Sequence, residues 1–250
     1  MTEEAIESTD GSPPGEEAGE AAVEDLTKSE PMRVSQAMED YLKAAYRLEL
    51  DGAPVSTQRL ADELGFSGPS VTNMVKRLDE LKLVKHSRYH GVTLTPAGKN
   101  VALEVIRHHR LLELYLAKAL GYDWDEVHEE AERLEHHVSR ELEQRMERVL
   151  GFPQFDPHGD PIPSRAGTLP VMDDMALTDV QNGVSGQVSR VSDRDADQLR
   201  HLAGLGVKPG VTLRVVDHLP FDGPIRIEIE GTEQLLSLTL ARGIRLIPSA

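Results

Sequence analysis

The sequence predicts a mainly α-helical chain that ends in a small β domain. Apolar residues recur at helical spacing from about residue 35 to residue 150, and capping residues separate the successive runs. After Gly183 the pattern changes to short strands. The intervening stretch, 151–182, is rich in proline, glycine and aspartate, which is typical of a linker.

Composition and charge exclude several classes of protein. The 250 residues contain no cysteine, which rules out a disulfide scaffold, a thiol nucleophile and a thiolate metal site. No uncharged apolar run approaches the roughly 18 residues of a membrane-spanning helix, and no signal-peptide pattern opens the chain. We therefore expect a cytoplasmic protein without a membrane partner.

The net charge of −16 is unevenly spread along the chain. Residues 1–30 hold ten carboxylates against the single base Lys28, and we expect this acidic tail to be disordered because it has too little apolar surface to bury. Residues 66–99 reverse the sign, with six bases and two acids. The segment that would meet a polyanion is therefore basic although the protein is acidic.

Periodicity and capping residues predict three helices and a hairpin in the N-terminal part. In order, these elements are a helix capped by Ser35 and ended by Asp51-Gly52, the helix Thr57–Leu64 between Ser56 and Gly65, a helix from about Gly68 to Leu81, and a hairpin over Leu83–Leu94.

Two long helices and a set of strands are expected after the hairpin. Thr95 is a capping residue followed by proline at the first helical position, which predicts a helix that reaches Leu120. Asp123 and Glu126 resemble a capping box and predict one continuous helix that ends at Leu150. The later elements are strands at 187–191, 212–216, 225–229 and 244–247, with a helix near 196–205.

The predicted elements follow the order of a winged helix-turn-helix: helix, glycine turn, helix and basic hairpin. The second helix of that motif enters the major groove of DNA. The start of that helix carries small donors and acceptors suited to base edges and phosphates. The candidate DNA-binding residues are Ser67, Pro69, Ser70, Thr72, Asn73, Lys76 and Arg77, with Arg88 at the tip of the wing. The alternative is an ordinary helical hairpin with a solvated polar face. We favour DNA binding because element order and charge reversal agree independently.

A second group of residues has the composition of a metal site. On the helix expected over 123–150, four side chains fall within an arc of roughly 100° that borders the apolar stripe: His128, Glu132, Glu135 and His136. The preceding helix offers His109 and Glu113, one turn apart on one face. Imidazole and carboxylate ligands suit Mn²⁺ or Fe²⁺. Spacing alone leaves open the alternative of salt-bridged surface histidines and glutamates.

These two groups, in this order, resemble the diphtheria-toxin-repressor family of iron- and manganese-dependent regulators. Four stretches carry the resemblance: Met38–Leu42 (MEDYL), Ser67–Thr72 (SGPSVT), Leu94–Gly98 (LTPAG) and His128–His136 (HEEAERLEH). The resemblance implies a metal-loaded homodimeric repressor that binds palindromic operators. It also implies a winged helix-turn-helix domain over 31–103, a helical metal-binding and dimerisation domain over 104–165, a linker over 166–182 and an SH3-like domain over 183–250.

Carried over to this chain, the resemblance implies a primary metal site formed by Asp40, Glu132, Glu135 and His136. An ancillary site would use His109, Glu113 and His128, with Asp195 and Gln198 from the SH3-like domain. Iron-type members have methionine and cysteine at the positions of Asp40 and Glu132, so the ligands here are closer to the manganese type. The expected cofactor is Mn²⁺, with Fe²⁺ as the alternative. Lys43 departs from the manganese-type pattern, which has a carboxylate at that position.

Two other functions use the same residues. A metallohydrolase or metal-storage protein could employ the carboxylate and histidine cluster, but the sequence has no glycine-rich phosphate loop, nucleophile elbow or HExxH motif, and we expect no enzyme activity. A winged-helix regulator that senses an organic ligand without metal is the other alternative.

Overall fold

The computed structural model describes residues 34–50, 52–87 and 91–249. The predictions for the acidic tail 1–30 and for Arg88 lie outside the described residues. No helix in the described ranges is long and apolar enough to cross a membrane.

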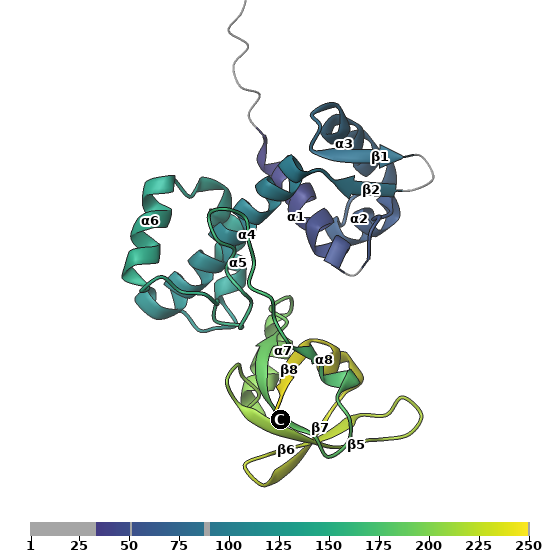
Figure 1. Ribbon diagram of the computed structural model, residues 1–250, viewed down its shortest axis with the longest axis vertical. Helices are drawn as coiled ribbons and strands as arrows, with labels where there is room; N and C mark the ends of the chain where they lie inside the picture. The colour runs from purple at the N-terminus through teal and green to yellow at the C-terminus, as the bar shows by residue number, and fades with distance from the viewer. Residues whose placement is uncertain (1–33, 51, 88–90, 250) are drawn as a thin grey trace, which may run out of the picture. The chain divides into compact units, whose positions relative to one another are not determined.

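The N-terminal domain contains the elements expected from its sequence. They are α1 (Gln36–Leu50), α2 (Thr57–Leu64), α3 (Gly68–Glu80) and the antiparallel pair β1 (Val84–Ser87) and β2 (Gly91–Leu94), drawn in purple to blue in Figure 1. The Ser56 hydroxyl accepts the Arg59 N–H at the start of α2, and Gly65 ends that helix at a φ of 68°. Val55 pairs with Val92, which fastens the loop before α2 to the hairpin.

The long helix α4 (Pro96–Tyr115) begins at the predicted Thr95 cap and continues through one wide π turn, η1 (Leu116–Leu120), to Gly121. Thr95 accepts the Gly98 N–H through its hydroxyl. A Cβ at Gly98 would lie 2.0 Å from the Leu83 carbonyl oxygen, so this close approach of helix to hairpin requires glycine. The helix therefore leaves the DNA-binding domain in a fixed direction.

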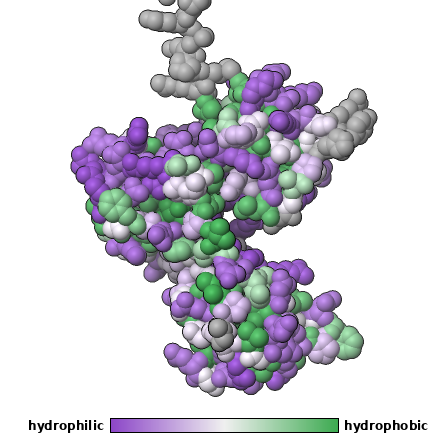
Figure 2. All heavy atoms as spheres, in the orientation of Figure 1, coloured by the Kyte–Doolittle hydropathy of each residue, from purple (hydrophilic) through white to green (hydrophobic). Residues whose placement is uncertain are grey.

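The prediction of one continuous helix over 123–150 is wrong. The segment forms α5 (Val127–Leu134), a 3₁₀ turn η2 (Glu135–His137) and α6 (Arg140–Val149). Val138 has extended backbone angles, and the Ser139 hydroxyl accepts the Leu142 N–H. A serine that caps a new helix competes with continuation of the old one, which is why the helix breaks here. The surface over α6 is largely hydrophilic on the face shown in Figure 2.

The first part of the proline- and glycine-rich stretch is packed, although its composition predicted only a linker. Asp156, His158 and Ile162 are buried, and Phe155 pairs with Pro161 in an isolated bridge. Arg110 of α4 donates to the Pro161 carbonyl oxygen at 2.6 Å. This segment therefore brings two polar side chains to the buried side of α4.

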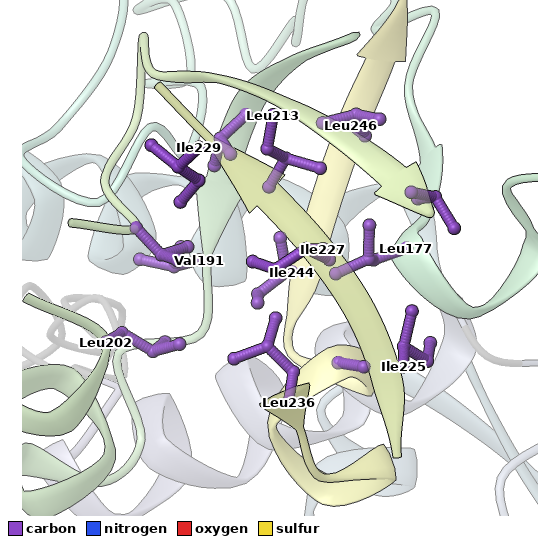
Figure 3. Packing of buried hydrophobic residues seen from close by; sticks show 14 of the residues in the cluster. Leu177, Val191, Leu202, Leu213, Ile225, Ile227, Ile229, Leu236, Ile244 and Leu246 are labelled. Carbon is purple, nitrogen blue, oxygen red and sulfur yellow. The ribbon is translucent and has the colours of Figure 1, made fainter. Parts of the chain in front are cut away.

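The C-terminal domain is a six-stranded antiparallel sheet of order β3-β8-β4-β5-β6-β7. The strands are β3 (Met175–Ala176), β4 (Ser185–Val191), β5 (Thr212–His218), β6 (Ile225–Ile229), β7 (Thr232–Leu236) and β8 (Ile244–Pro248), accompanied by η3 (Leu177–Asp179), α7 (Ala196–Gly204) and α8 (Leu238–Arg242). Alternate residues of the strands, such as Ile225, Ile227 and Ile244, point into one apolar core (Figure 3).

Candidate metal centre and nucleic-acid interface

The second helix of the helix-turn-helix exposes the residues predicted to contact DNA. Val71, Val75 and Leu78 form the buried face of α3. On the other side Ser67, Pro69, Ser70, Asn73, Lys76 and Arg77 are exposed, and Thr72 is half-buried. The Thr72 hydroxyl donates to the Gly68 carbonyl oxygen at 2.9 Å. The exposed face therefore combines small polar groups near the N-terminus with two cations a turn further on, as base and phosphate contacts require.

His136, in the η2 turn, is held from both sides by α1. Its Nε2 lies 2.9 Å from Asp40 Oδ1, and its Nδ1 lies 2.6 Å from Glu39 Oε2. Burial raises the pKa of Asp40, and the His136 charge opposes that rise. A carboxylate on one ring nitrogen orients the other nitrogen toward a metal ion. Glu39 was not predicted from the sequence, although it precedes Asp40 in the stretch that carried the resemblance.

Glu135 is fully buried and connects two groups of possible ligands. Its Oε1 lies 3.6 Å from His136 Nε2, and its Oε2 lies 2.6 Å from His109 Nδ1. Burial would raise the pKa of Glu135, but the His109 hydrogen bond and the Lys43 charge lower it. Of the predicted primary ligands, Asp40, Glu135 and His136 lie together, whereas Glu132 groups with Glu135 and His109.

A second group combines residues from α4, α5 and the loop after β4. The Glu113 Oε1 atom lies 3.0 Å from His109 Nε2 and 3.2 Å from His128 Nδ1, and His128 Nδ1 lies 3.2 Å from Asp193 Oδ2. Metal–ligand bonds of about 2.1 Å separate adjacent ligands of an octahedron by roughly 3.0 Å, so this spacing suits a divalent ion. Asp193 was not predicted.

The structure does not bring Asp195 and Gln198 to this group. Asp195 caps α7, where its Oδ1 accepts the Gln198 backbone N–H at 3.1 Å and its Oδ2 accepts the Gln198 side-chain amide at 3.0 Å. Neither residue belongs to a possible ligand group within the described part of the chain. The pair satisfies its own polar groups, while Asp193, two residues earlier, faces His128.

A third group shares Glu113 and is entirely buried. Glu113 Oε2, Asp156 Oδ2 and His158 Nδ1 have no hydrogen-bond partner among the described residues, whereas His158 Nε2 lies 2.7 Å from the Trp124 carbonyl oxygen. Donation from Nε2 to that carbonyl would leave Nδ1 as the metal ligand once the ring gives up its second proton. Buried polar atoms without partners are costly, and a cation shared by these three would satisfy them together. The residues therefore fit a metal ion.

Two histidines of these groups, His128 and His158, are cationic near neutral pH in the absence of a metal ion. Burial by itself would lower the pKa of His128, but hydrogen bonds with Asp193 and Glu113 outweigh burial and raise its pKa to about 10. Burial likewise opposes protonation of His158, and the Glu113 carboxylate raises its pKa to about 9. Protonated imidazoles thus compensate the carboxylates that a metal ion would otherwise neutralise.

Comparison with known proteins shows the family of this chain. The model of the N-terminal DNA-binding domain of iron-dependent repressors matches residues 33–92, that of their metal-binding and dimerisation domain matches 95–164, and the FeoA domain matches 175–248. The iron-dependent repressor IdeR of Mycobacterium tuberculosis is 34% identical over 209 residues, which cover 79% of this chain and 90% of the relative. The chain belongs to the iron-dependent repressor family.

Two further kinds of relative extend the comparison. The diphtheria toxin repressor of Corynebacterium diphtheriae is 30% identical over 225 residues, covering 83% of this chain and 95% of that protein. The solved structure of a manganese-dependent transcriptional repressor complex with manganese has a TM-score of 0.80 at 40% identity, covering 85% of this chain and 100% of that one. The manganese regulator SloR has a TM-score of 0.72 at 33% identity, covering 85% and 98%.

Membership of the iron-dependent repressor family confirms the resemblance and the predicted fold class. The DNA-binding helices come first, the helical metal and dimerisation domain follows, and the FeoA domain is the expected SH3-like domain. The family consists of DNA-binding transcriptional repressors and not of enzymes, which excludes the metallohydrolase alternative. Its members include iron-dependent and manganese-dependent proteins, in agreement with the expected cofactors.

Proposed function

We propose that this protein is a Mn²⁺-responsive transcriptional repressor that binds palindromic operator DNA as a homodimer in the cytoplasm, with Fe²⁺ as the alternative ion. One observation carries the proposal. Glu39 and Asp40, neighbours on α1, lie against the two ring nitrogens of His136 at 2.6 and 2.9 Å. Because α1 packs on α2 within the DNA-binding domain, an ion bound at His136 acts directly on the domain that reads DNA.

The proposed primary ligands are Asp40, Glu132, Glu135 and His136. When bound, the ion supplies a positive charge that holds these carboxylates together. Glu39 keeps the His136 ring oriented so that Nε2 faces the ion, and Asp40 ties α1 to the η2 turn. Operator binding and ion binding then favour the same arrangement of α1, so each must raise the affinity of the other by the same factor.

The proposed ancillary ligands are His109, Glu113 and His128 with Asp193 in place of Asp195 and Gln198. Asp156 and His158 complete the buried side of this site, where atoms of theirs that make no hydrogen bond lie close to Glu113. All these ligands are carboxylate oxygens or imidazole nitrogens. Such sets suit Mn²⁺ and Fe²⁺ better than the soft ions that prefer sulfur.

The homodimer is supported by apolar side chains exposed in the metal domain. Leu142 and Val149 on α6 and Phe152 just after it are exposed by 43%, 69% and 66%. Exposed apolar side chains grouped on one short segment are typical of a protein–protein contact. The metal domain is also the part that matches the dimerisation domain of the family.

Operator binding measured by fluorescence anisotropy tests this function. The chelated protein should bind operator DNA weakly, and Mn²⁺ added under anaerobic conditions should restore binding at least as well as Fe²⁺. Glu39→Ala should need more Mn²⁺ than wild type, whereas the control Gln36→Ala, which removes a contact to the neighbouring His137, should not. Equal operator binding with and without chelator would refute the proposal.

A further inference from the structure

One cation of the chain is buried inside the proposed primary site. Lys43 follows Asp40 by one turn on α1, and only 4% of the residue is exposed. Its ammonium lies 2.5 Å from Glu132 Oε1 and 2.7 and 2.8 Å from the two oxygens of Glu135. An ammonium has three protons, so these three contacts use its full donor capacity.

The oxygens that Lys43 holds are the same oxygens that an ion needs. Glu135 Oε1 lies 3.6 Å from His136 Nε2, and Glu132 Oε1 lies 3.8 Å from His109 Nδ1, so both oxygens are within reach of the possible nitrogen ligands. Each of these oxygens keeps a second lone pair, but an ion that uses it lies within about 4 Å of the ammonium charge. The ion must therefore either displace the ammonium or bind beside it against charge repulsion, and both lower its affinity.

We propose that Lys43 is a specificity-determining residue: its ammonium competes with the activating ion for Glu132 and Glu135 and so raises the ion concentration at which the primary site fills. The inference rests on the proposed function, because it concerns the same site. It predicts that ions which bind only the carboxylate oxygens, and bind them weakly, fail to displace the ammonium. Ions that also bind the His136 nitrogen should displace it.

A purely structural role for Lys43 predicts the opposite sign. If Lys43 only held α1 to the η2 turn, its removal would disorder the ligands and weaken ion binding. If it competes, its removal leaves Glu132 and Glu135 with a more negative potential, and the ion binds more tightly. The direction of the change in affinity therefore separates the two roles.

The test measures the Mn²⁺ dissociation constant of the full chain by competition with a fluorescent chelator, without DNA. In Lys43→Met and Lys43→Gln, the dissociation constant of the highest-affinity Mn²⁺ site should be at least tenfold lower than in wild type, because a unit charge within about 4 Å of the ion is removed. Lys43→Arg should stay near wild type. Lys99→Met is the matched control, since it removes one positive charge from a pair with Glu49 of α1, outside the metal ligands.

Stability gives a second measurement on the same variants. Lys43→Met leaves the buried Glu135 carboxylate with fewer partners, so the melting temperature of this variant in chelator should fall below that of wild type. Mn²⁺ should then raise its melting temperature by more than it raises that of wild type. Lys43→Gln retains an amide donor for Glu135 and serves if the methionine variant does not fold.

The proposal is overturned if folded Lys43→Gln binds Mn²⁺ as weakly as wild type or more weakly, or if Lys99→Met tightens binding equally. The first result would give Lys43 a structural role and the second a general charge effect. Failure of wild type to bind Mn²⁺ or Fe²⁺ at all would instead refute the proposed function itself, and this inference with it.

Discussion

Metal binding at the ancillary site should release protons, because His128 and His158 are cationic before the ion arrives. The pKa of His128 is raised to about 10 and that of His158 to about 9. At pH 7 a pKa of 10 leaves about one imidazole in a thousand neutral. Removing that proton from His128 costs about 4 kcal/mol of the binding free energy, from about 1.4 kcal/mol per pH unit.

This cost fixes the pH dependence of binding. Each histidine that binds the ion releases one proton, so the apparent association constant should rise about tenfold per pH unit per histidine between pH 7 and about 9. The same shift affects stability without metal. A raised histidine pKa stabilises the fold fully below the unfolded value of about 6.5, and that stabilisation is lost as the pH rises through 9 to 10. Chelated protein should therefore melt at lower temperatures as the pH increases over this window.

Isothermal titration calorimetry in two buffers of different ionisation enthalpy measures the protons released. We expect one to two protons per ancillary ion at pH 7 and about one fewer in His128→Gln. His201→Gln, an exposed histidine of α7, should leave the proton count unchanged. A binding enthalpy independent of buffer, with an affinity that does not change between pH 7 and 8, would refute the reasoning.

Three further predictions concern DNA binding and the primary site. Arg77→Ala should weaken binding to every DNA sequence and lower the salt dependence by about one phosphate contact, whereas Asn73→Ala should change the preference between operators. Anisotropy titrations over a salt series distinguish the two effects. Wild-type salt slopes and operator preferences in both variants would contradict the assignment. Glu132→Ala should abolish Mn²⁺-dependent operator binding, while Glu129→Ala on the same helix should be close to neutral; equal losses would show an effect of general acidity. Lys43→Glu replaces the internal cation by a carboxylate and should add a bound Mn²⁺ per protomer or change the preferred ion, measured by elemental analysis and calorimetry. An unchanged stoichiometry and preference would contradict that prediction.

Local signals in the sequence were sufficient for much of the fold. The caps at Ser56 and Thr95 and the stop at Gly65 depend only on neighbouring backbone groups, and the structure contains each of them. His109 and Glu113 were also predictable as a pair, because residues four apart share one face of any helix.

The break between α5 and α6 was missed because periodicity continued through it. The apolar spacing from Val127 to Val149 is compatible with one helix, but Ser139 caps a second helix and Val149 is left exposed. Glu135 still follows α5, because its backbone is right-handed helical and its N–H bonds to the Ala131 carbonyl oxygen. His136 lies in the 3₁₀ turn, so its place beside α1 could not be read from helical spacing alone.

The sequence by itself determined the helix and strand order, the basic recognition segment and the types of ligand available. Only the tertiary structure decided which of those ligands meet. Glu39, Asp156, His158 and Asp193 come from a helix N-terminus and from loops, where sequence spacing says nothing about direction. Burial around Glu113 selects Asp156, His158 and Asp193, because carboxylates and imidazoles removed from water must find partners, and these lie in segments up to 80 residues away in the chain.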